Sequence, residues 1–172
     1  MKEFLLIAQA VHGNRKALEQ LVGRYYEKIY QYIFYKVRDK SIAEVLTQDV
    51  FLKLVKNIHA YVPTASFSSY LYRIAHNRVV DYYRTMKFTE ELSEGQTVTD
   101  PLKSVEEKIT IEGLLCKLPE EQRECIILYY MQELTYREIS QILKIPIPTA
   151  KSRVQRGLKA CKKILEENHG SI

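Results

Sequence analysis

The stretch from Leu134 to Lys163 constrains the fold of this chain most, because it reads as two short helices joined by a tight turn. Thr135 and Glu138 match a capping box, in which two side chains satisfy backbone groups at the start of a helix. Pro146 predicts the break between the helices, since proline has no backbone N–H and disfavours helical geometry in the residue before it. The sequence therefore predicts a helix-turn-helix unit whose turn lies at residues 144–146.

Apolar residues at helical spacing predict one buried face on each helix of this unit. On the first helix the face consists of Ile139, Ile142 and Leu143. On the second helix the expected buried seam consists of Ile147, Ala150, Val154, Leu158 and Cys161.

The same segment holds eight Lys or Arg residues and one acid, Glu138. Small polar and forked basic side chains at the start of a second helix suit the base edges of a DNA major groove, and lysines behind them suit phosphates. A solvated amphipathic hairpin with a lysine-rich face is the alternative interpretation. The capping box, the turn and the polar residues within one window favour DNA binding.

Composition predicts an all-α fold. Glycine is scarce among the 172 residues, few runs alternate in polarity, and long segments follow a 3.6-residue period. In the N-terminal half we expect helices at 2–11, 15–37, 41–58 and 67–85. The aromatic residues of the second of these helices are assigned to packing: Tyr25, Tyr26, Tyr30, Tyr32, Phe34 and Tyr35. The apolar stripe of the last helix consists of Phe67, Leu71, Ile74, Ala75, Val79 and Tyr82.

Charge divides the chain into two basic blocks around an acidic middle. The net charge is +5; residues 1–84 carry 13 bases and 7 acids, residues 85–133 carry 5 and 11, and residues 134–172 carry 8 and 3. The middle block includes Gly95 and Asp100-Pro101 and has little periodicity, a composition typical of a linker.

We therefore expect two small helical domains, 1–86 and 105–172, joined by a flexible acidic linker at 87–104. The C-terminal domain is the one that contains the helix-turn-helix.

The sequence offers no catalytic or metal-binding constellation. Its three cysteines have no CxxC spacing and are expected to be reduced thiols of a cytoplasmic protein. Its four histidines are scattered, so we expect no enzyme activity, no metal and no cofactor. The apolar run at the N-terminus is too short for a signal peptide or a membrane span, so no membrane insertion is expected.

Three segments together resemble a small bacterial sigma factor of the sigma-70 superfamily, of the extracytoplasmic-function (ECF) type. LTQDVFLKLVKNI at 46–58 resembles the family helix that docks on core RNA polymerase. FSSYLYRIAHNRVVDYYR at 67–84 resembles the segment that opens and reads the minus-ten element. LPEEQRECIILYYMQELTYREISQIL at 118–143, continued by TAKSRVQRGLKACKK, resembles the module that reads the minus-35 element.

The resemblance implies a protein that binds core RNA polymerase, directs promoter-specific initiation and helps to open the DNA. The implied polymerase-binding residues are Gln48, Asp49, Leu52, Lys53 and Lys56. Those implied for minus-ten DNA are His59, Tyr61, Tyr70, Arg73, His76, Asn77 and Arg84. Those implied for minus-35 DNA are Thr149, Lys151, Ser152, Arg153, Gln155, Arg156 and Lys159.

The implied partners are the clamp and flap of core polymerase, promoter DNA and an anti-sigma factor. The sequence departs from the family pattern at Tyr70, where tryptophan is usual, and at Lys144, where the turn usually has glycine. A left-handed backbone at Lys144 would cost about 1 kcal/mol. Two other functions remain open from the residues alone, a stand-alone helix-turn-helix regulator and a helical interaction protein.

Overall fold

The computed structural model describes residues 2–92 and 110–169, and within these ranges the regular structure is entirely helical, as predicted. The N-terminal part consists of α1 (Glu3–Val11), α2 (Arg15–Val37), α3 (Lys40–Asn57), the short 3₁₀ helix η1 (Ile58–Ala60) and α4 (Phe67–Leu92). The C-terminal part consists of α5 (Ile111–Cys116), α6 (Glu120–Ile126), the π-helical turn η2 (Ile127–Met131), α7 (Tyr136–Leu143) and α8 (Ile147–His169).

Local signals explain where α2 and α3 begin. The side chain of Asn14 caps α2 by accepting a hydrogen bond from the Ala17 N–H, and Asp39 caps α3 through the N–H of Ile42. The helix expected at 67–85 is longer than predicted and continues to Leu92. No glycine or proline interrupts residues 86–92, so nothing local ends the helix there. Most of the expected linker, from residue 93 onward, lies outside the described residues.

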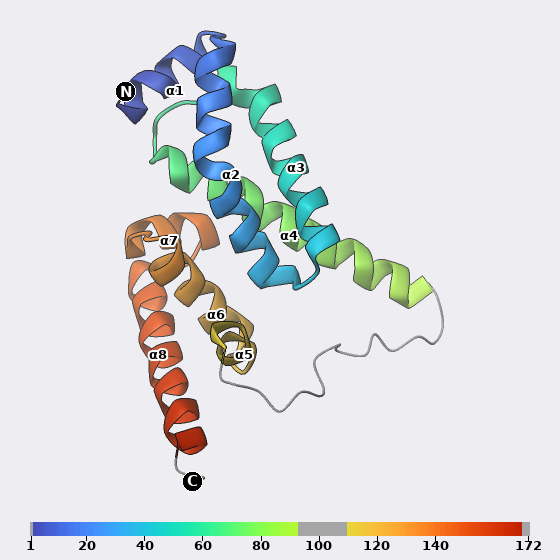
Figure 1. Ribbon diagram of the computed structural model, residues 1–172, viewed down its shortest axis with the longest axis vertical. Helices are drawn as coiled ribbons and strands as arrows, with labels where there is room; N and C mark the ends of the chain where they lie inside the picture. Colours follow the sequence, from blue (N-terminus) through green and yellow to red (C-terminus); the bar gives the residue numbers. More distant parts are fainter. Residues whose placement is uncertain (1, 93–109, 170–172) are drawn as a thin grey trace.

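The N-terminal core forms where α2 packs against α1, α3 and α4 (Figure 1). Its apolar side chains come from all four helices and from η1. The largest that are almost fully buried include Leu6, Leu21, Ile29, Ile33, Leu54, Ile58 and Leu71.

The predicted helix-turn-helix is confirmed. Thr135 and Glu138 form the capping box at the start of α7, with each side chain bonded to the backbone N–H of the other residue. Lys144 ends α7 in the left-handed conformation, with a φ of 55°. The C-terminal core lies where α8 packs on α6 and α7, and it includes Ile139 and Val154.

The seam expected on the second helix of the unit is correct at Ala150, Val154 and Cys161 and wrong at its other two positions. Ile147 is 46% exposed and Leu158 is 40% exposed. Gly157 is buried instead, because α6 approaches α8 so closely that a Cβ atom there would lie 2.5 Å from Ile126 Cδ1. The side of α8 that faces α6 is therefore the side that carries Gly157.

The two parts pack against each other. α4 contacts α7, and α2 contacts η2 at the end of α6 (Figure 1). The start of α4, with the loop that precedes it, therefore lies beside the helix-turn-helix unit.

Candidate nucleic-acid interface

The residues predicted to contact polymerase lie on one helix, α3, and most of them are exposed. Gln48, Lys53 and Lys56 are exposed, and Leu52 is 56% exposed although it is a large apolar residue. Asp49 is only half-exposed, because its carboxylate forms an ion pair with Arg78 of α4. Among residues 2–92 and 110–169, no helix covers the outer face of α3, but one of its predicted contacts, Asp49, is already engaged within the chain.

A small cavity lies at the start of α4, and we call it the loop pocket. Its volume is about 200 Å³. Its lining consists of Thr64, Ala65, Ser69, Tyr70 and Arg73 from the N-terminal part and Gln141 from α7. The cavity thus brings together two of the predicted minus-ten residues, Tyr70 and Arg73, with the loop that precedes α4.

Aromatic packing holds the loop next to this pocket. The ring of Tyr61 lies 5.0 Å from the ring of Tyr70 and 5.6 Å from that of Phe67, measured between centroids. The Tyr61 hydroxyl donates a hydrogen bond to the carbonyl of Ala65, at 3.1 Å. Tyr61 therefore shapes the loop, and its hydroxyl is used within the chain.

The other predicted minus-ten residues do not line the loop pocket. Asn77 and Arg84 are exposed further along α4, and Arg84 pairs with Asp81 at 2.8 Å. The His59 ring bonds the carbonyl of Val11 at 2.9 Å. His76 points toward the C-terminal part, where its ring bonds the carboxylate of Glu124.

The predicted minus-35 residues lie in the N-terminal half of α8. Lys151, Gln155, Arg156 and Lys159 are exposed, whereas Thr149, Ser152 and Arg153 are partly buried. A groove of about 420 Å³, here called the recognition groove, lies along this half of the helix. It is lined by Pro119, Glu121, Gln122, Pro148, Thr149, Ser152, Arg153 and Arg156.

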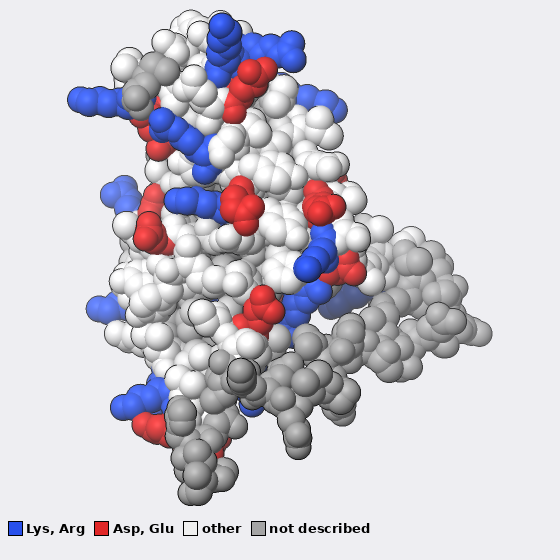
Figure 2. Space-filling model, viewed as in Figure 1, with Lys and Arg blue, Asp and Glu red and all other residues white. Residues whose placement is uncertain are grey.

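The two arginines of this groove differ in whether an acidic side chain pairs with them. Arg153 pairs with Glu121 of α6, with a distance of 2.7 Å between the charged atoms. Among the described residues, no acid pairs with Arg156, so its guanidinium is available to a ligand. Basic and acidic side chains are interspersed over the face shown in Figure 2.

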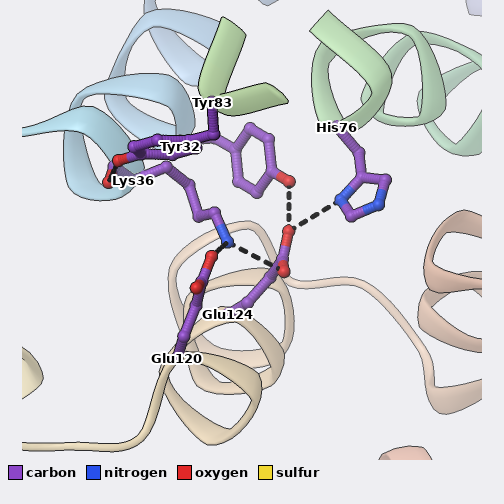
Figure 3. Close-up of polar contacts among 6 residues, drawn as sticks. All are labelled: Tyr32, Lys36, His76, Tyr83, Glu120 and Glu124. Carbon is purple, nitrogen blue, oxygen red and sulfur yellow. Dashed lines mark hydrogen bonds and ion pairs between the residues drawn. The ribbon is translucent and has the colours of Figure 1, made fainter. Parts of the chain in front are cut away.

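A cluster of polar side chains between the two parts was missed by the sequence analysis (Figure 3). The carboxylate of Glu124 accepts hydrogen bonds from Tyr32 at 2.6 Å, from His76 at 2.9 Å and from Lys36 at 2.9 Å. Lys36 also donates to Glu120 at 2.9 Å. We call these five residues the Glu124 cluster.

Burial and charge act in opposite directions on Glu124. Burial favours its neutral form, but the hydrogen bond from His76 and the charge of Lys36 outweigh that effect and lower the pKa of the carboxyl to about 2. Burial alone would lower the pKa of Lys36, yet its two acidic neighbours raise it above the ordinary value. The pair is therefore charged. One sequence signal could have revealed that Lys36 is buried. Lys36 continues the buried stripe of Ile29 and Ile33 at helical spacing.

The fold and these surfaces define a two-part helical protein whose C-terminal part contains a helix-turn-helix unit. Residues 21–89 match the family model for sigma-70 region 2, and residues 108–161 match that for sigma-70 region 4. The chain belongs to the ECF sigma factors of the sigma-70 family.

Relatives of known function cover nearly the whole chain. It is 32% identical over 178 residues to the ECF RNA polymerase sigma factor SigW of Bacillus subtilis, an alignment that covers 94% of this chain and 95% of SigW. It is 35% identical over 155 residues to the RNA polymerase sigma factor SigZ of the same organism, covering 87% of each chain. The chain is thus a sigma factor, a transcription initiation factor that directs core RNA polymerase to promoters.

Two solved structures share the fold. CnrH in complex with the cytosolic domain of CnrY has a TM-score of 0.73 at 22% identity and covers 95% of this chain and 96% of its own. The sigma factor RpoE of Bartonella quintana, in complex with the anti-sigma factor NepR, has a TM-score of 0.76 at 20% identity and covers 88% and 98%. Within residues 2–92 and 110–169, no helix is both long and apolar enough to cross a membrane.

Proposed function

We propose that this sigma factor binds polymerase, the minus-ten strand and the minus-35 element with three different surfaces. The outer face of α3 binds the clamp of core polymerase, the loop pocket and the adjoining face of α4 read the opened minus-ten strand, and the recognition groove of α8 reads the minus-35 element. The first two surfaces belong to a domain at 1–86 and the third to a domain at 105–172, which also contacts the polymerase flap. The linker at 87–104 joins them.

The loop pocket is the observation that carries this proposal. It combines an aromatic ring, Tyr70, with a cation, Arg73, and small polar groups from Thr64 and Ser69. Single-stranded DNA is bound by such combinations, since bases stack on aromatic rings at ~1–3 kcal/mol per base and cations hold the backbone. Opening a duplex costs a few kcal/mol for each unstacked base, so contacts of this kind can offset it.

Transcription by purified components tests the proposal as a whole. Core polymerase with this chain is expected to make transcripts from genomic DNA that share upstream sequence elements, and core polymerase alone is expected not to. Stable binding of duplex DNA by the chain without polymerase, together with no new transcripts, would instead indicate the stand-alone regulator. A cytoplasmic location and an anti-sigma partner belong to the same proposal, supported by family membership.

Leu52→Asp is expected to lower the affinity for core polymerase by about tenfold or more. Exposed apolar residues at the centre of an interface often dominate its binding energy, and a charge there must lose its water on binding. Leu52 is a better position than Asp49 for testing this interface, because replacing Asp49 would also remove the ion pair with Arg78. Pull-down or interferometry with core polymerase measures the effect. Leu5→Asp, at an exposed leucine of α1, is the matched control, and equal losses in both variants would contradict the assignment.

Asn77→Ala is expected to slow promoter opening about two- to tenfold while polymerase binding is unchanged. The exposed amide of Asn77 offers both a donor and an acceptor to a base edge, and one hydrogen bond is worth about 0.5–1.5 kcal/mol. Permanganate reactivity of thymines in the melted region measures the effect. Val80→Ala, at another exposed position of α4, is the control. Identical footprints for wild type and Asn77→Ala would remove Asn77 from the minus-ten surface.

A further inference from the structure

An ion pair lies inside the recognition groove. The guanidinium of Arg153, on α8, is 2.7 Å from a carboxylate oxygen of Glu121, on α6, and both residues line the groove. The side chain of Arg153 is 23% exposed, whereas that of Glu121 is 70% exposed. The cation therefore lies largely against the protein, and the carboxylate that neutralises it is open to solvent.

The thiol of Cys125, on α6, also lies beside Arg153. Burial raises the pKa of this thiol to about 11, even though the charge of Arg153 acts to lower it. The thiol is therefore neutral at neutral pH and does not balance the charge of the guanidinium. Among the described residues, Glu121 is the only acid that forms an ion pair with Arg153.

This pairing sets the charge of the groove. Among the described residues that line it, the charged ones are Glu121, Arg153 and Arg156. Two positive charges and one negative charge give the lining a net charge of +1. Because Glu121 offsets Arg153, this net charge is concentrated on Arg156. Without the negative charge of Glu121, the two arginines would give the lining a net charge of +2.

A free cation in a DNA-binding groove holds every DNA sequence alike. Phosphates carry the same charge at each base pair, so contacts with them add affinity without sequence information. Sequence is read through the edges of the bases. An acid in the groove lowers the phosphate-driven part of the affinity in two ways, because it neutralises a cation and repels any phosphate that comes near it.

We propose that Glu121 is a specificity-determining residue of the minus-35 reader, which withholds Arg153 from DNA phosphates and leaves Arg156 as the charged group of the groove that meets the DNA. The inference rests on the proposed role of the recognition groove. It changes the role that the family resemblance implies for Arg153, from a DNA contact to a partner of Glu121. At a polymerase concentration that nearly fills the preferred promoter, weaker phosphate binding leaves poorer promoters empty, so the acid increases discrimination between promoters.

Glu121→Gln, in the complex of this chain with core polymerase, tests the inference, because glutamine keeps the shape of the side chain and removes its charge. Promoter affinity is measured at about 50 and 200 mM salt. The ratio of the two affinities is expected to be about 3.5-fold larger than for wild type, which is the effect of one added phosphate contact. At the lower salt concentration, the variant should also occupy promoters with altered minus-35 elements more fully. Unchanged or weaker binding would overturn the inference.

Glu166→Gln is the matched control. It makes the same charge change on α8 and releases Lys162, with which Glu166 forms an exposed ion pair at 3.8 Å. Neither of these two residues lines the recognition groove. The control is expected to keep the salt dependence of wild type. An equal increase in both variants would show that the effect follows the net charge of the whole chain, and the assignment to Glu121 would be wrong.

Arg153→Met tests whether Arg153 itself touches DNA. The single variant leaves Glu121 without its partner, so weaker binding to every promoter is expected. The double variant Glu121→Gln with Arg153→Met has the groove charge of wild type, +1 from Arg156, and is expected to bind with wild-type affinity and salt dependence. Circular dichroism confirms that each variant is folded. A folded double variant that binds as weakly as Arg153→Met would show that Arg153 contacts DNA, contrary to the inference.

Arg156→Ala distinguishes this inference from the proposed function. If Arg156→Ala loses no discrimination among variants of the minus-35 element, the groove does not read that element and the proposed function fails. If Arg156→Ala loses discrimination while Glu121→Gln keeps the salt dependence of wild type, the groove reads the element without help from Glu121, and only the inference fails.

Discussion

Arg156→Ala is expected to abolish discrimination at one base pair of the minus-35 element, with a loss of ~1–3 kcal/mol for the preferred base. Arg156 is exposed in the recognition groove, and no acid of the described residues neutralises it. A free guanidinium can donate two hydrogen bonds to the O6 and N7 acceptors of one guanine. The loss of activity in Arg156→Ala should therefore depend on the DNA sequence of the minus-35 element. Transcription from a promoter and from its single-base variants in the upstream element measures it.

Lys159→Ala is expected to affect all promoter sequences equally, in contrast to Arg156→Ala. Lys159 lies almost one turn further along α8 and is exposed, so we expect it to contact a phosphate. Its removal should weaken binding on every promoter variant alike and reduce the salt dependence of binding by about one phosphate contact. If Arg156→Ala and Lys159→Ala lose the same activity on every variant, Arg156 is a phosphate contact and does not read a base.

Gly157→Leu is expected to destabilise the C-terminal part by about 1–3 kcal/mol, because it inserts a large side chain where α6 and α8 already touch. A Cβ atom at position 157 would lie 2.5 Å from Ile126 Cδ1 and 3.2 Å from Ile126 Cγ1. Gly157→Ala should be far milder. The end of the Ile126 side chain can rotate, and alanine favours a helix over glycine by about 1 kcal/mol. Urea denaturation followed by circular dichroism measures both.

A double variant assigns the cost of Gly157→Leu to this one contact. Ile126→Ala removes the atoms that a side chain at position 157 would meet, so Gly157→Leu should cost less in that background. The two substitutions should couple by about 1 kcal/mol or more, as expected for residues in direct contact. Additive effects would show that the strain arises elsewhere.

Some of the candidate site could be predicted from the sequence because its residues lie close together in the chain. The spacing of Lys151, Gln155 and Arg156 along one helix places them on one exposed surface, and the structure has them exposed. Leu52 and Lys53 are exposed on α3 for the same reason. Their assigned contacts with DNA and polymerase stay predictions, since exposure alone does not identify a partner.

The orientation of other site residues could not be predicted, because it depends on neighbours distant in sequence. His76 was expected to contact DNA, yet its ring bonds Glu124, 48 positions away. The carboxylate of Asp49 bonds Arg78 in the next helix. A helical repeat shows which residues share a face, but it does not show which other element covers that face.

The sequence by itself determined the helices, the turn and the family. Capping at Thr135, the break before Pro146 and the apolar repeat act over a few residues, so they produce the same local structure wherever the segment lies. Only the tertiary structure decided that Gly157, and not Leu158, lies on the buried side of α8, and how the two parts meet. Tyr32 and Glu124 are 92 positions apart, and their contact requires both domains to be folded and docked. Local backbone preferences are encoded residue by residue, whereas burial of a charge depends on everything that surrounds it.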